Sequence, residues 1–376
     1  MTADQPPPAA AVPGSLFERH PKATVGVLLC LTLVPLDYLA GRRLAWAHRL
    51  VEKSYRMPSP FYHHDLRPNR SVSVRWGDNQ YTMTTDSMGF RDQAVRDVAP
   101  HGSRPRLLFI GDSFTEGSGV AYEDSFVGRV ARALPGTEVL NAGVASYSPI
   151  IYYRKAKHLL EERGLRFDEV AVFLDISDVE DETEYDFDAD GNVVENAQFD
   201  SDRSRGLGDD FLTQHSALFQ VGQRLLMRLR LRWYWNRPQD LMTLWPYSSD
   251  RARWTFDDRA FHRFGEQGLD RARSHMEMLV GLLREHGIPL YLAVYPWPPQ
   301  IVFDTLGSRQ VRYWREWAEH EGVPFLDYFP EFLEGDKLQT IHDCFIPGDM
   351  HWSPTGHARV ARGFVSFLER SRLKSQ

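Results

Sequence analysis

The sequence has only two cysteines in 376 residues, Cys30 in an apolar segment and Cys344 near the C-terminus. Two thiols placed so far apart define neither a disulfide framework nor a CxxC metal site. Basic residues are not in excess either, because 51 acidic side chains outnumber 44 basic ones and the net charge is −7. Nucleic-acid-binding domains normally carry clustered positive charge, so we expect no nucleic-acid partner.

Metal-binding patterns are equally sparse. The stretch DFDADGNVVENA, residues 186–197, begins like a calcium loop, but its twelfth position is Ala197, where a bidentate glutamate is required. A hairpin turn at Asp190-Gly191-Asn192 is the simpler interpretation. The cluster His63-His64-Asp65 has no third ligand at a suitable spacing. We therefore expect no metal and no organic cofactor.

One long apolar run stands out. Residues 23–40 carry a single charge, Asp37, and follow a Pro/Ala-rich leader in residues 1–22 that we expect to be disordered. Eighteen residues are close to the shortest length that crosses a bilayer, about 17 to 25. Pro35 and Asp37 weaken this interpretation, and a buried N-terminal helix is the alternative. We predict a single-pass transmembrane signal anchor.

The orientation of this anchor is ambiguous. Only Arg19 and Lys22 precede the apolar run, whereas more basic residues follow it. These are Arg42, Arg43, Arg49, Lys53 and Arg56. The positive-inside rule favours a cytoplasmic C-terminal domain, although long domains cross membranes largely regardless of charge.

The remaining chain predicts a small β region and one large α/β domain. Residues 41–104 are expected to form a juxtamembrane helix and a hairpin around Gly77-Asp78-Asn79. In residues 105–376, expected strands alternate with expected helices, which indicates a parallel sheet with helices on both faces. The strands are expected at 106–111, 137–144, 169–177, 288–297 and 323–329, and the helices at 122–134, 150–163, 269–286, 311–321 and 354–370.

A long insertion, at about 178–268, interrupts this alternation. The sixteen residues 175–190 hold nine acids and no base, and residues 211–235 are apolar and basic at helical spacing. Insertions of this length are usually caps over the active end of the sheet; a solvated elaboration is the alternative. The acidic run is expected to be solvated, and near the site it would repel anionic substrates.

Polar residues follow each expected strand, where ligands bind in open parallel sheets. Among them, Ser113 lies at a strand-to-helix turn and His351 lies two residues after Asp349. A hydroxyl, an imidazole and a carboxylate are the groups that acyl transfer needs. In extended backbone, residues 349 and 351 point to the same side, so Asp349 can hold the imidazole. Pro354 should begin the last helix and carry the competing base, His357, away from this loop.

Gly111-Asp112-Ser113, with the downstream pair Asp349 and His351, resembles the SGNH/GDSL hydrolase superfamily. The similarity covers residues 105–370 apart from the insertion, and is greatest to membrane-associated bacterial branches that modify cell-surface glycans. The Asp-to-His spacing of two is similar to the alginate-acetylation branch. The resemblance implies a flavodoxin-like three-layer α/β/α sandwich, with Ser113 as nucleophile, His351 as base and Asp349 as its partner.

The resemblance also implies an oxyanion hole. Its donors would be the backbone N–H groups of Ser113 and Gly143, while the third block of the family normally adds an asparagine side chain. Here Ser177 stands at that position, and a serine hydroxyl is shorter and less preorganised. Asn141 can compensate if its side chain faces the substrate. Loss of one good donor costs on the order of 100- to 1000-fold in rate.

The segment VYPWPPQ, residues 294–300, suggests an exposed Trp297 that could stack on a sugar, although a packed turn is equally compatible with it. Together with Tyr295 and Trp352, this favours a carbohydrate substrate.

These patterns lead to one predicted function and one alternative. We predict a serine esterase or O-acyltransferase acting on acyl, chiefly acetyl, esters of a bacterial cell-surface glycan. It is expected in the inner membrane, with its catalytic domain in the periplasm by analogy with the resembling branches. The alternative is a weakly active or inactive glycan-binding scaffold subunit, which the departure at Ser177 favours. No pattern specifies an oligomeric state.

Overall fold

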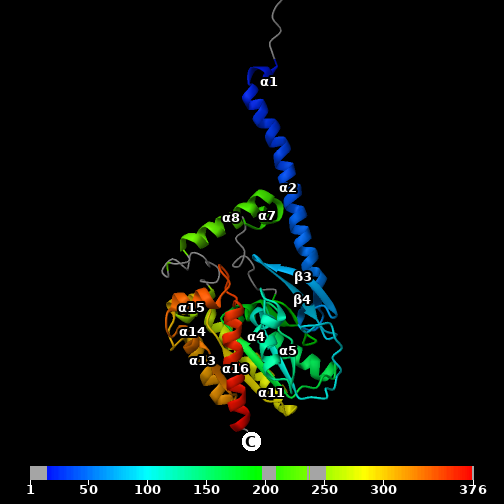
Figure 1. Ribbon diagram of the computed structural model, residues 1–376, viewed down its shortest axis with the longest axis vertical. Helices are drawn as coiled ribbons and strands as arrows, with labels where there is room; N and C mark the ends of the chain where they lie inside the picture. Colours follow the sequence, from blue (N-terminus) through cyan, green and yellow to red (C-terminus); the bar gives the residue numbers. More distant parts are fainter. Residues whose placement is uncertain (1–14, 197–208, 235–236, 238–250, 375–376) are drawn as a thin grey trace, which may run out of the picture. The chain divides into compact units, whose positions relative to one another are not determined.

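Figure 1 shows the computed structural model, which describes residues 15–196, 209–234, 237 and 251–374. The chain divides into two compact units, residues 1–49 with 201–225 and residues 50–200 with 226–376. Most of the leader predicted in residues 1–22 lies outside the described residues. Its described part contains one short helix, α1 (Leu16–Arg19).

The predicted anchor is part of a longer helix, α2 (Pro21–Tyr55), which also includes the predicted juxtamembrane helix. Its most apolar window of eighteen residues has a mean hydropathy of 1.8, and none of that window is buried. By length and composition, α2 can cross a membrane. Its 35 residues extend for about 50 Å at 1.5 Å per residue, so the helix is longer than a hydrocarbon core of roughly 30 Å.

The larger unit is built on a parallel five-stranded sheet. Its strands are β5 (Arg106–Gly111), β6 (Glu138–Asn141), β7 (Glu169–Leu174), β10 (Leu290–Val294) and β11 (Phe325–Asp327). They lie in the order β11-β10-β7-β5-β6 and pair in parallel throughout. This is the flavodoxin-like order, in which ligands bind where the strand order reverses, here between β5 and β7.

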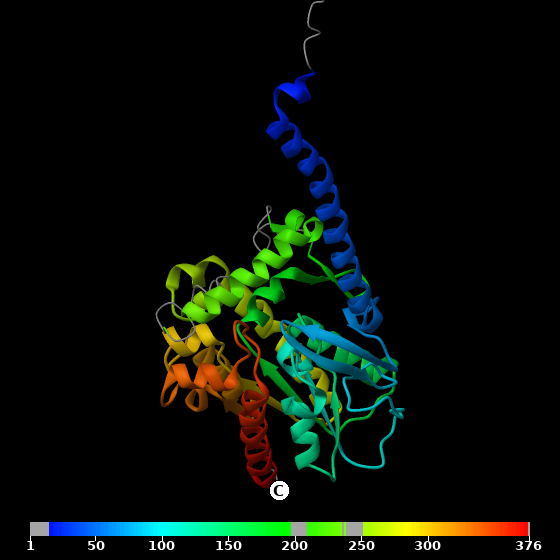
Figure 2. The ribbon, with the colours of Figure 1, turned by 45° about the horizontal axis from the view of Figure 1, so that its top comes forward.

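Helices cover both faces of this sheet, which confirms the predicted α/β fold. α4 (Phe126–Ala133) and α16 (Pro354–Lys374) pack together on one face. Right-handed crossovers place α5 (Pro149–Lys157) and α11 (Glu266–Glu285) on the other face, where they pack against each other (Figures 1 and 2). The helix α13 (Arg309–Glu321) connects β10 to β11.

Aromatic rings fill the first of these interfaces. Phe126 of α4 and Phe364 of α16 both contact Phe109 of β5 and Phe173 of β7, with centroids 4.5 to 5.6 Å apart. All four are at most 1% exposed. Burying such rings contributes roughly 1.5–3 kcal/mol each, so this cluster holds the carboxyl ends of β5 and β7 in fixed positions.

The small β region comprises two hairpins. The predicted hairpin is β3 (Arg70–Trp76) with β4 (Asn79–Thr85), and a second, unpredicted one is β1 (Arg56–Ser59) with β2 (His63–Leu66). Arg91 forms isolated bridges to both Thr85 and Asn141. The β3–β4 hairpin is thereby joined to β6, the strand at one edge of the main sheet.

The insertion and the connections are mostly helical. The insertion contains α6 (Ser177–Glu184), the β8 (Tyr185–Phe187) and β9 (Val193–Glu195) hairpin, α7 (Asp209–His215), α8 (Ala217–Tyr234) and α10 (Asp258–Ala260). Elsewhere lie α3 (Ser113–Glu116), α12 (Pro298–Phe303), α14 (Phe329–Leu333) and α15 (Lys337–Cys344). Single-turn 3₁₀ or π segments are η1 (Tyr122–Asp124), η2 (His158–Glu162), η5 (Arg253–Thr255) and η6 (Phe261–Gly265).

The acidic start of the insertion is not solvated, contrary to expectation. On α6, Asp178 accepts a hydrogen bond from Tyr152 Oη, Asp181 pairs with Arg251, and Glu182 pairs with His275. All three acids are at most 6% exposed. Buried carboxylates need such partners. The tail of the acidic run does form the expected hairpin turn, since Asp188 accepts from the backbone N–H groups of Asp190 and Asn192.

Candidate active site

A tight turn at the end of β5 presents Ser113. Asp112 caps α3 by accepting the Phe114 N–H at 2.9 Å, and Gly117 ends the helix in the left-handed conformation, with φ of 82°. Gly111 is required here, because a Cβ at this position would lie 2.2 Å from Thr115 Oγ1. In the run from Gly111 to Val120, Ser113 alone is not fully buried. The turn therefore exposes one hydroxyl from an otherwise closed segment.

Ser113, His351 and Asp349 form one hydrogen-bonded series. Ser113 Oγ lies 2.8 Å from His351 Nε2, and His351 Nδ1 lies 2.5 Å from Asp349 Oδ1. The same carboxylate oxygen accepts the backbone N–H of His351 at 2.9 Å. A neutral imidazole can donate from Nδ1 to the carboxylate while Nε2 accepts the serine proton. The structure thus brings together the three side chains that the sequence singled out, 238 residues apart at their widest.

Trp76 is a fourth member of this arrangement that sequence reasoning missed. Its indole Nε1 donates to Asp349 Oδ2 at 2.8 Å, and its ring meets the His351 ring edge-on at 4.9 Å between centroids. Phe114 lies on another side of the imidazole at 4.8 Å. The carboxylate and the imidazole are therefore both held from outside their own loop. No local signal marks Trp76, because it lies 273 residues from Asp349.

These contacts determine the charge of Asp349. Burial acts to raise its pKa, but the neighbouring His351, the hydrogen bonds from His351 and the indole N–H of Trp76 together lower it below the ordinary value. Hydrogen bonds to the charged form favour ionisation. Asp349 therefore remains a carboxylate into the acidic range, ready to stabilise an imidazolium.

His357 takes no part in this series. α16 begins at Pro354, as predicted, and carries His357 into the core, where it is 0% exposed. Its Nδ1 accepts the backbone N–H of Phe126 at 3.1 Å. Burial, followed by the charges of Arg91 and His351, lowers its pKa well below the ordinary value. The side chain is a neutral structural histidine.

The loop after β6 lies directly beside α3. A Cβ at Gly143 would meet the Thr115 Cγ2 atom at 2.6 Å, so only glycine permits this approach. The Gly143 N–H, an expected oxyanion donor, donates to Asn141 Oδ1 at 3.1 Å. Asn141 in turn donates from Nδ2 to the Thr115 carbonyl oxygen at 2.8 Å, and it is 1% exposed. Asn141 therefore organises the loop instead of facing a substrate.

Ser177 is likewise occupied within the protein. Both its backbone N–H and its hydroxyl donate to Asp175 Oδ1, at 2.6 and 2.7 Å. A hydroxyl has one proton to donate. The structure places that proton on Asp175 instead of leaving it for an oxyanion.

The expectation that Trp297 is exposed is wrong. Trp297 is 3% exposed, and its indole N–H donates to Asp175 Oδ2 at 2.7 Å. Tyr295 and Trp352 are each 0% exposed. The hydroxyl of Tyr295 also has buried partners, Asp112 at 3.2 Å and Asp175 at 3.3 Å, whereas the indole N–H of Trp352 is buried without a hydrogen-bond partner among the described residues. The three rings support the floor of the site, and they offer no face on which a sugar could stack.

Two buried acids behind the serine favour their neutral forms. Burial, and then the adjacent Asp175, raise the pKa of Asp112 well above the ordinary value. The same two causes, in the same order, raise the pKa of Asp178. Like charges in a low-dielectric site cannot all ionise. Protonation of these acids limits the negative charge beside a position where an oxyanion would develop.

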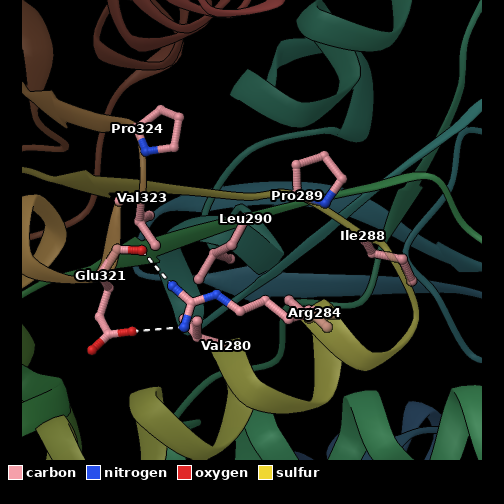
Figure 3. Close-up of a pocket in the computed structure, with 10 residues that line it drawn as sticks. Val280, Arg284, Ile288, Pro289, Leu290, Glu321, Val323 and Pro324 are labelled. Atoms are coloured by element: carbon pink, nitrogen blue, oxygen red, sulfur yellow. Dashed lines mark hydrogen bonds and ion pairs between the residues drawn. The ribbon is translucent and has the colours of Figure 1, made fainter. Parts of the chain in front are cut away.

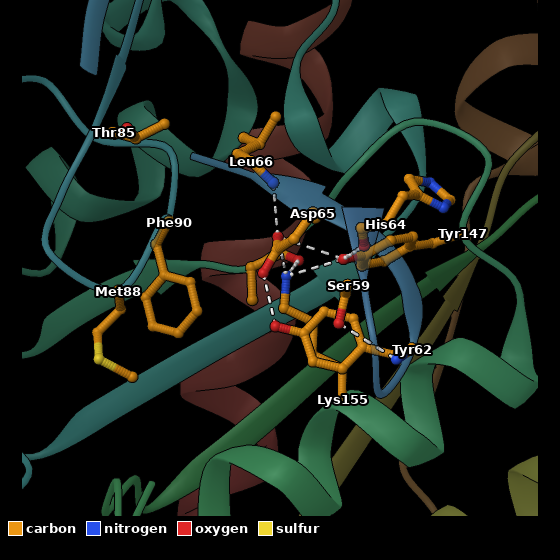
Figure 4. Close-up of polar contacts among 12 residues, drawn as sticks. Ser59, Tyr62, His64, Asp65, Leu66, Thr85, Met88, Phe90, Tyr147 and Lys155 are labelled. Atoms are coloured by element: carbon orange, nitrogen blue, oxygen red, sulfur yellow. Dashed lines mark hydrogen bonds and ion pairs between the residues drawn. The ribbon is translucent and has the colours of Figure 1, made fainter. Parts of the chain in front are cut away.

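A buried lysine holds the Gly143 loop from the opposite side. Lys155 Nζ donates to the Ala142 carbonyl oxygen at 3.1 Å, to Asp65 Oδ1 at 2.8 Å and to Tyr147 Oη at 3.1 Å (Figure 4). The Ala142 carbonyl belongs to the same peptide unit as the Gly143 N–H. Burial lowers the pKa of Lys155, and the Asp65 carboxylate opposes this. The cluster thus connects the β2 hairpin to the loop beside Ser113.

Replacing Lys155 with methionine is expected to lower the free energy of unfolding by about 3–5 kcal/mol, because Asp65 would remain buried without its counter-ion. Lys157 provides a matched control. It lies two residues further along α5, is 40% exposed and pairs with Glu161 at 4.0 Å, so its replacement by methionine should change stability by less than about 1 kcal/mol. Denaturant unfolding followed by tryptophan fluorescence measures both, and equal effects would contradict the prediction.

A cavity of about 120 Å³ lies at the amino ends of strands β10 and β11, whereas Ser113 follows the carboxyl end of β5 (Figure 3). Its lining includes Ile288 and Leu290 at the amino end of β10 and Val323 before β11. Arg284 and Glu321 also line it and pair with each other at 2.9 Å. Because ligands of such sheets bind at the carboxyl ends of the strands, this cavity is separate from the candidate site. Within the described ranges, no group of three or more His, Cys, Asp or Glu side chains is arranged to hold a metal.

No family model and no curated protein matches this sequence. Solved structures do resemble it. One is a catalytic variant of an acetylxylan esterase from Geobacillus stearothermophilus, with 17% identity, a TM-score of 0.39, and coverage of 72% of this chain and 96% of that one. Another is a GDSL-like lipase from Bacteroides thetaiotaomicron, with 11% identity, a TM-score of 0.38, and coverage of 73% and 91%. The chain is therefore similar to GDSL-type lipases and esterases, and at these low scores the chemistry of its site rests on its own geometry.

Proposed function

We propose that the chain is a serine-dependent acyl-ester hydrolase or O-acyltransferase. The observation that carries the proposal is the series Ser113 Oγ, His351 Nε2, His351 Nδ1 and Asp349 Oδ1, with successive contacts of 2.8 and 2.5 Å. Its support is geometric, because a nucleophile, a base within hydrogen-bond reach and a group that orients the base are what covalent acyl transfer requires.

In the proposed mechanism, His351 Nε2 takes the proton of Ser113 as the serine oxygen bonds to the ester carbonyl carbon. The backbone N–H groups of Ser113 and Gly143 are the proposed donors to the oxyanion. Collapse of the tetrahedral intermediate breaks the ester C–O bond, and His351 returns its proton to the leaving alcohol. Water or a sugar hydroxyl then attacks the acyl-serine, again with His351 as base, and Ser113 recovers its proton.

The proposed substrate class is acyl, chiefly acetyl, esters of a bacterial cell-surface glycan. It rests on the sequence resemblance, since the buried ring of Trp297 lends it no support. We further propose that α2 anchors the chain in the inner membrane, with the catalytic domain in the periplasm. A reporter active on only one side of the membrane, fused to the C-terminus, tests the orientation: activity of a cytoplasmic reporter would overturn it.

A weakly active or inactive scaffold is the second candidate. The observations that favour it are the Gly143 N–H, which is bonded to Asn141, and the Ser177 hydroxyl, which is bonded to Asp175. With both donors engaged inside the protein, stabilisation of the oxyanion falls on fewer groups, which costs on the order of 100- to 1000-fold for each donor lost.

A fluorophosphonate probe separates the two candidates. The esterase should be labelled covalently, and mass spectrometry should locate the label on Ser113, with no labelling of Ser113→Ala. A scaffold should remain unlabelled. Incubation with an acetylated oligosaccharide and an unacetylated acceptor then distinguishes hydrolysis, which releases acetate, from transfer, which produces the acetylated acceptor.

A further inference from the structure

The exposed side of α8 is apolar. Six large hydrophobic residues on this helix are between 45% and 73% exposed, and we call them the apolar stripe. They are Leu218, Val221, Leu225, Leu226, Leu229 and Trp233. Successive residues of an α-helix lie about 100° apart around its axis, so these six positions fall on one continuous face. Exposed apolar patches of this kind mark interaction surfaces.

The opposite side of α8 is already occupied. Met227 and Leu231 are half-buried, and Leu231 packs against the hydrophobic core. Leu231 also lies close to Gly348, where an added Cβ would be 3.1 Å from its Cδ2 atom. The helix therefore does not need the apolar stripe for its own packing. The stripe is left for a partner.

The charge of α8 indicates what kind of partner this is. Residues 217–234 contain four arginines and no acidic residue. Around the helix axis, Arg224 and Arg228 border the apolar stripe on one side and Arg230 borders it on the other, while Arg232 falls within the stripe near the C-terminal end of the helix. Arg228 also pairs with Asp78 at 3.0 Å, in an ion pair whose two side chains are both largely exposed. An apolar face between basic borders fits an anionic lipid surface, in which a helix lies parallel to the bilayer.

The start of α8 is tied to the predicted anchor. Asp37 of α2 accepts a hydrogen bond from Ser216 Oγ at 2.6 Å and another from the Leu218 backbone N–H at 2.7 Å. This pairing accounts for the only charge in the apolar run, because Asp37 satisfies the first turn of α8. Gly41 permits the contact, since a Cβ there would lie 2.5 Å from the backbone of His215. The helix α8 therefore begins beside the end of the apolar run, where a membrane-spanning segment would leave the hydrocarbon core.

We propose that the apolar stripe of α8 lies in the surface of an anionic phospholipid bilayer, as a second, interfacial membrane attachment beside the α2 anchor. The proposal rests on the anchor put forward above and does not depend on the esterase mechanism. The leucines and Trp233 enter the acyl-chain boundary, while the bordering arginines contact lipid phosphates. The proposal thereby gives α8, the basic helix of the insertion, an anionic lipid as its partner.

The test places single fluorophores on the full chain. In a Cys30→Ser background, where the remaining Cys344 is buried, NBD is attached at Leu225→Cys in the apolar stripe. Gln223→Cys is the matched control, because Gln223 is also exposed and lies about 200° around the helix. Val27→Cys, in the apolar run, reports on the anchor. Each variant is reconstituted in vesicles of anionic and zwitterionic phospholipids, with and without nitroxide-labelled lipid.

The expected result is NBD emission at Leu225→Cys that is blue-shifted and quenched by the nitroxide lipid at least twofold more than at Gln223→Cys. Removal of the anionic lipid should reduce this difference. Quenching at Val27→Cys with none at Leu225→Cys would overturn the inference and leave the anchor intact. A blue shift at Leu225→Cys without lipid quenching would overturn it in favour of a protein partner. Absence of quenching at Val27→Cys as well would overturn both the anchor and the inference.

Discussion

Replacing Ser113 with alanine is expected to lower kcat for an activated acyl ester by about 10⁴- to 10⁶-fold, the range seen when a catalytic serine is removed. Without the hydroxyl, His351 has no nucleophile to deprotonate, and only binding and the oxyanion donors remain. His351→Ala should cause a loss of the same order, because the hydroxyl then has no base within 2.8 Å. Steady-state hydrolysis of p-nitrophenyl acetate measures both.

The double variant Ser113→Ala/His351→Ala distinguishes a catalytic unit from two separate contributions. Residues that act together are strongly non-additive, so it should be no slower than either single variant. Ser103→Ala is the control, since Ser103 is exposed and precedes the amino end of β5, whereas Ser113 follows its carboxyl end; its activity should equal that of the wild type. Activity that survives in both single variants would refute the mechanism and favour the scaffold.

Replacing Asp349 with asparagine is expected to lower kcat by about 10⁴-fold, as in the serine proteases where this substitution stabilises the wrong imidazole tautomer. An asparagine can offer its NH₂ group to His351 Nδ1, which leaves Nε2 protonated and unable to accept the serine proton. With its NH₂ group in the place of Oδ1, the variant keeps the oxygen that accepts the Trp76 N–H and loses the acceptor of the His351 backbone N–H. The expected loss is therefore mainly in kcat, with a smaller loss of thermal stability from the one missing backbone hydrogen bond.

Trp76→Phe is the matched comparison for Asp349→Asn. It removes one of the hydrogen bonds to the carboxylate and leaves the carboxylate itself in place, so its loss of kcat should be smaller. The acidic range adds a second readout. Because the pKa of Asp349 lies below its ordinary value, the carboxylate should stay ionised well into the acidic range, so the ratio of wild-type to Asp349→Asn activity should persist as the pH falls below neutral. A kcat for Asp349→Asn within tenfold of the wild type would contradict the assigned role.

Much of the fold was predictable because it depends on local patterns. The apolar runs ending at Gly111 and Leu174, and the amphipathic segments between them, specify strands and helices by the period of their side chains. The crossover rule then limits how such units are arranged. The start of the last helix was also predictable from a local signal, since α16 begins at Pro354 as expected. The short helices α12 and α15 were not predicted, because such short segments show no clear side-chain period.

The polar residues of the site were less predictable. Asp349 and His351 could be paired from their spacing, since they lie on one short loop. The partners of Trp76, Asn141 and Ser177 could not be predicted, because each is determined by hydrogen bonds that form only when distant loops meet. The burial of Trp297 could not be predicted for the same reason. The prolines on either side of it suggested an exposed turn, but the fold buries the ring against Asp175.

The amino-acid sequence by itself determined the order of strands and helices, the candidate membrane span and the identity of the serine, histidine and aspartate. Only the tertiary structure decided that Trp76 supports Asp349, that the acids of α6 are buried with partners, and that Asp37 caps α8. The physical reason is the range of the interactions. Side-chain periodicity depends only on residues that are close together in the sequence. Burial and hydrogen-bond partners depend on which distant segments the packed core brings into contact.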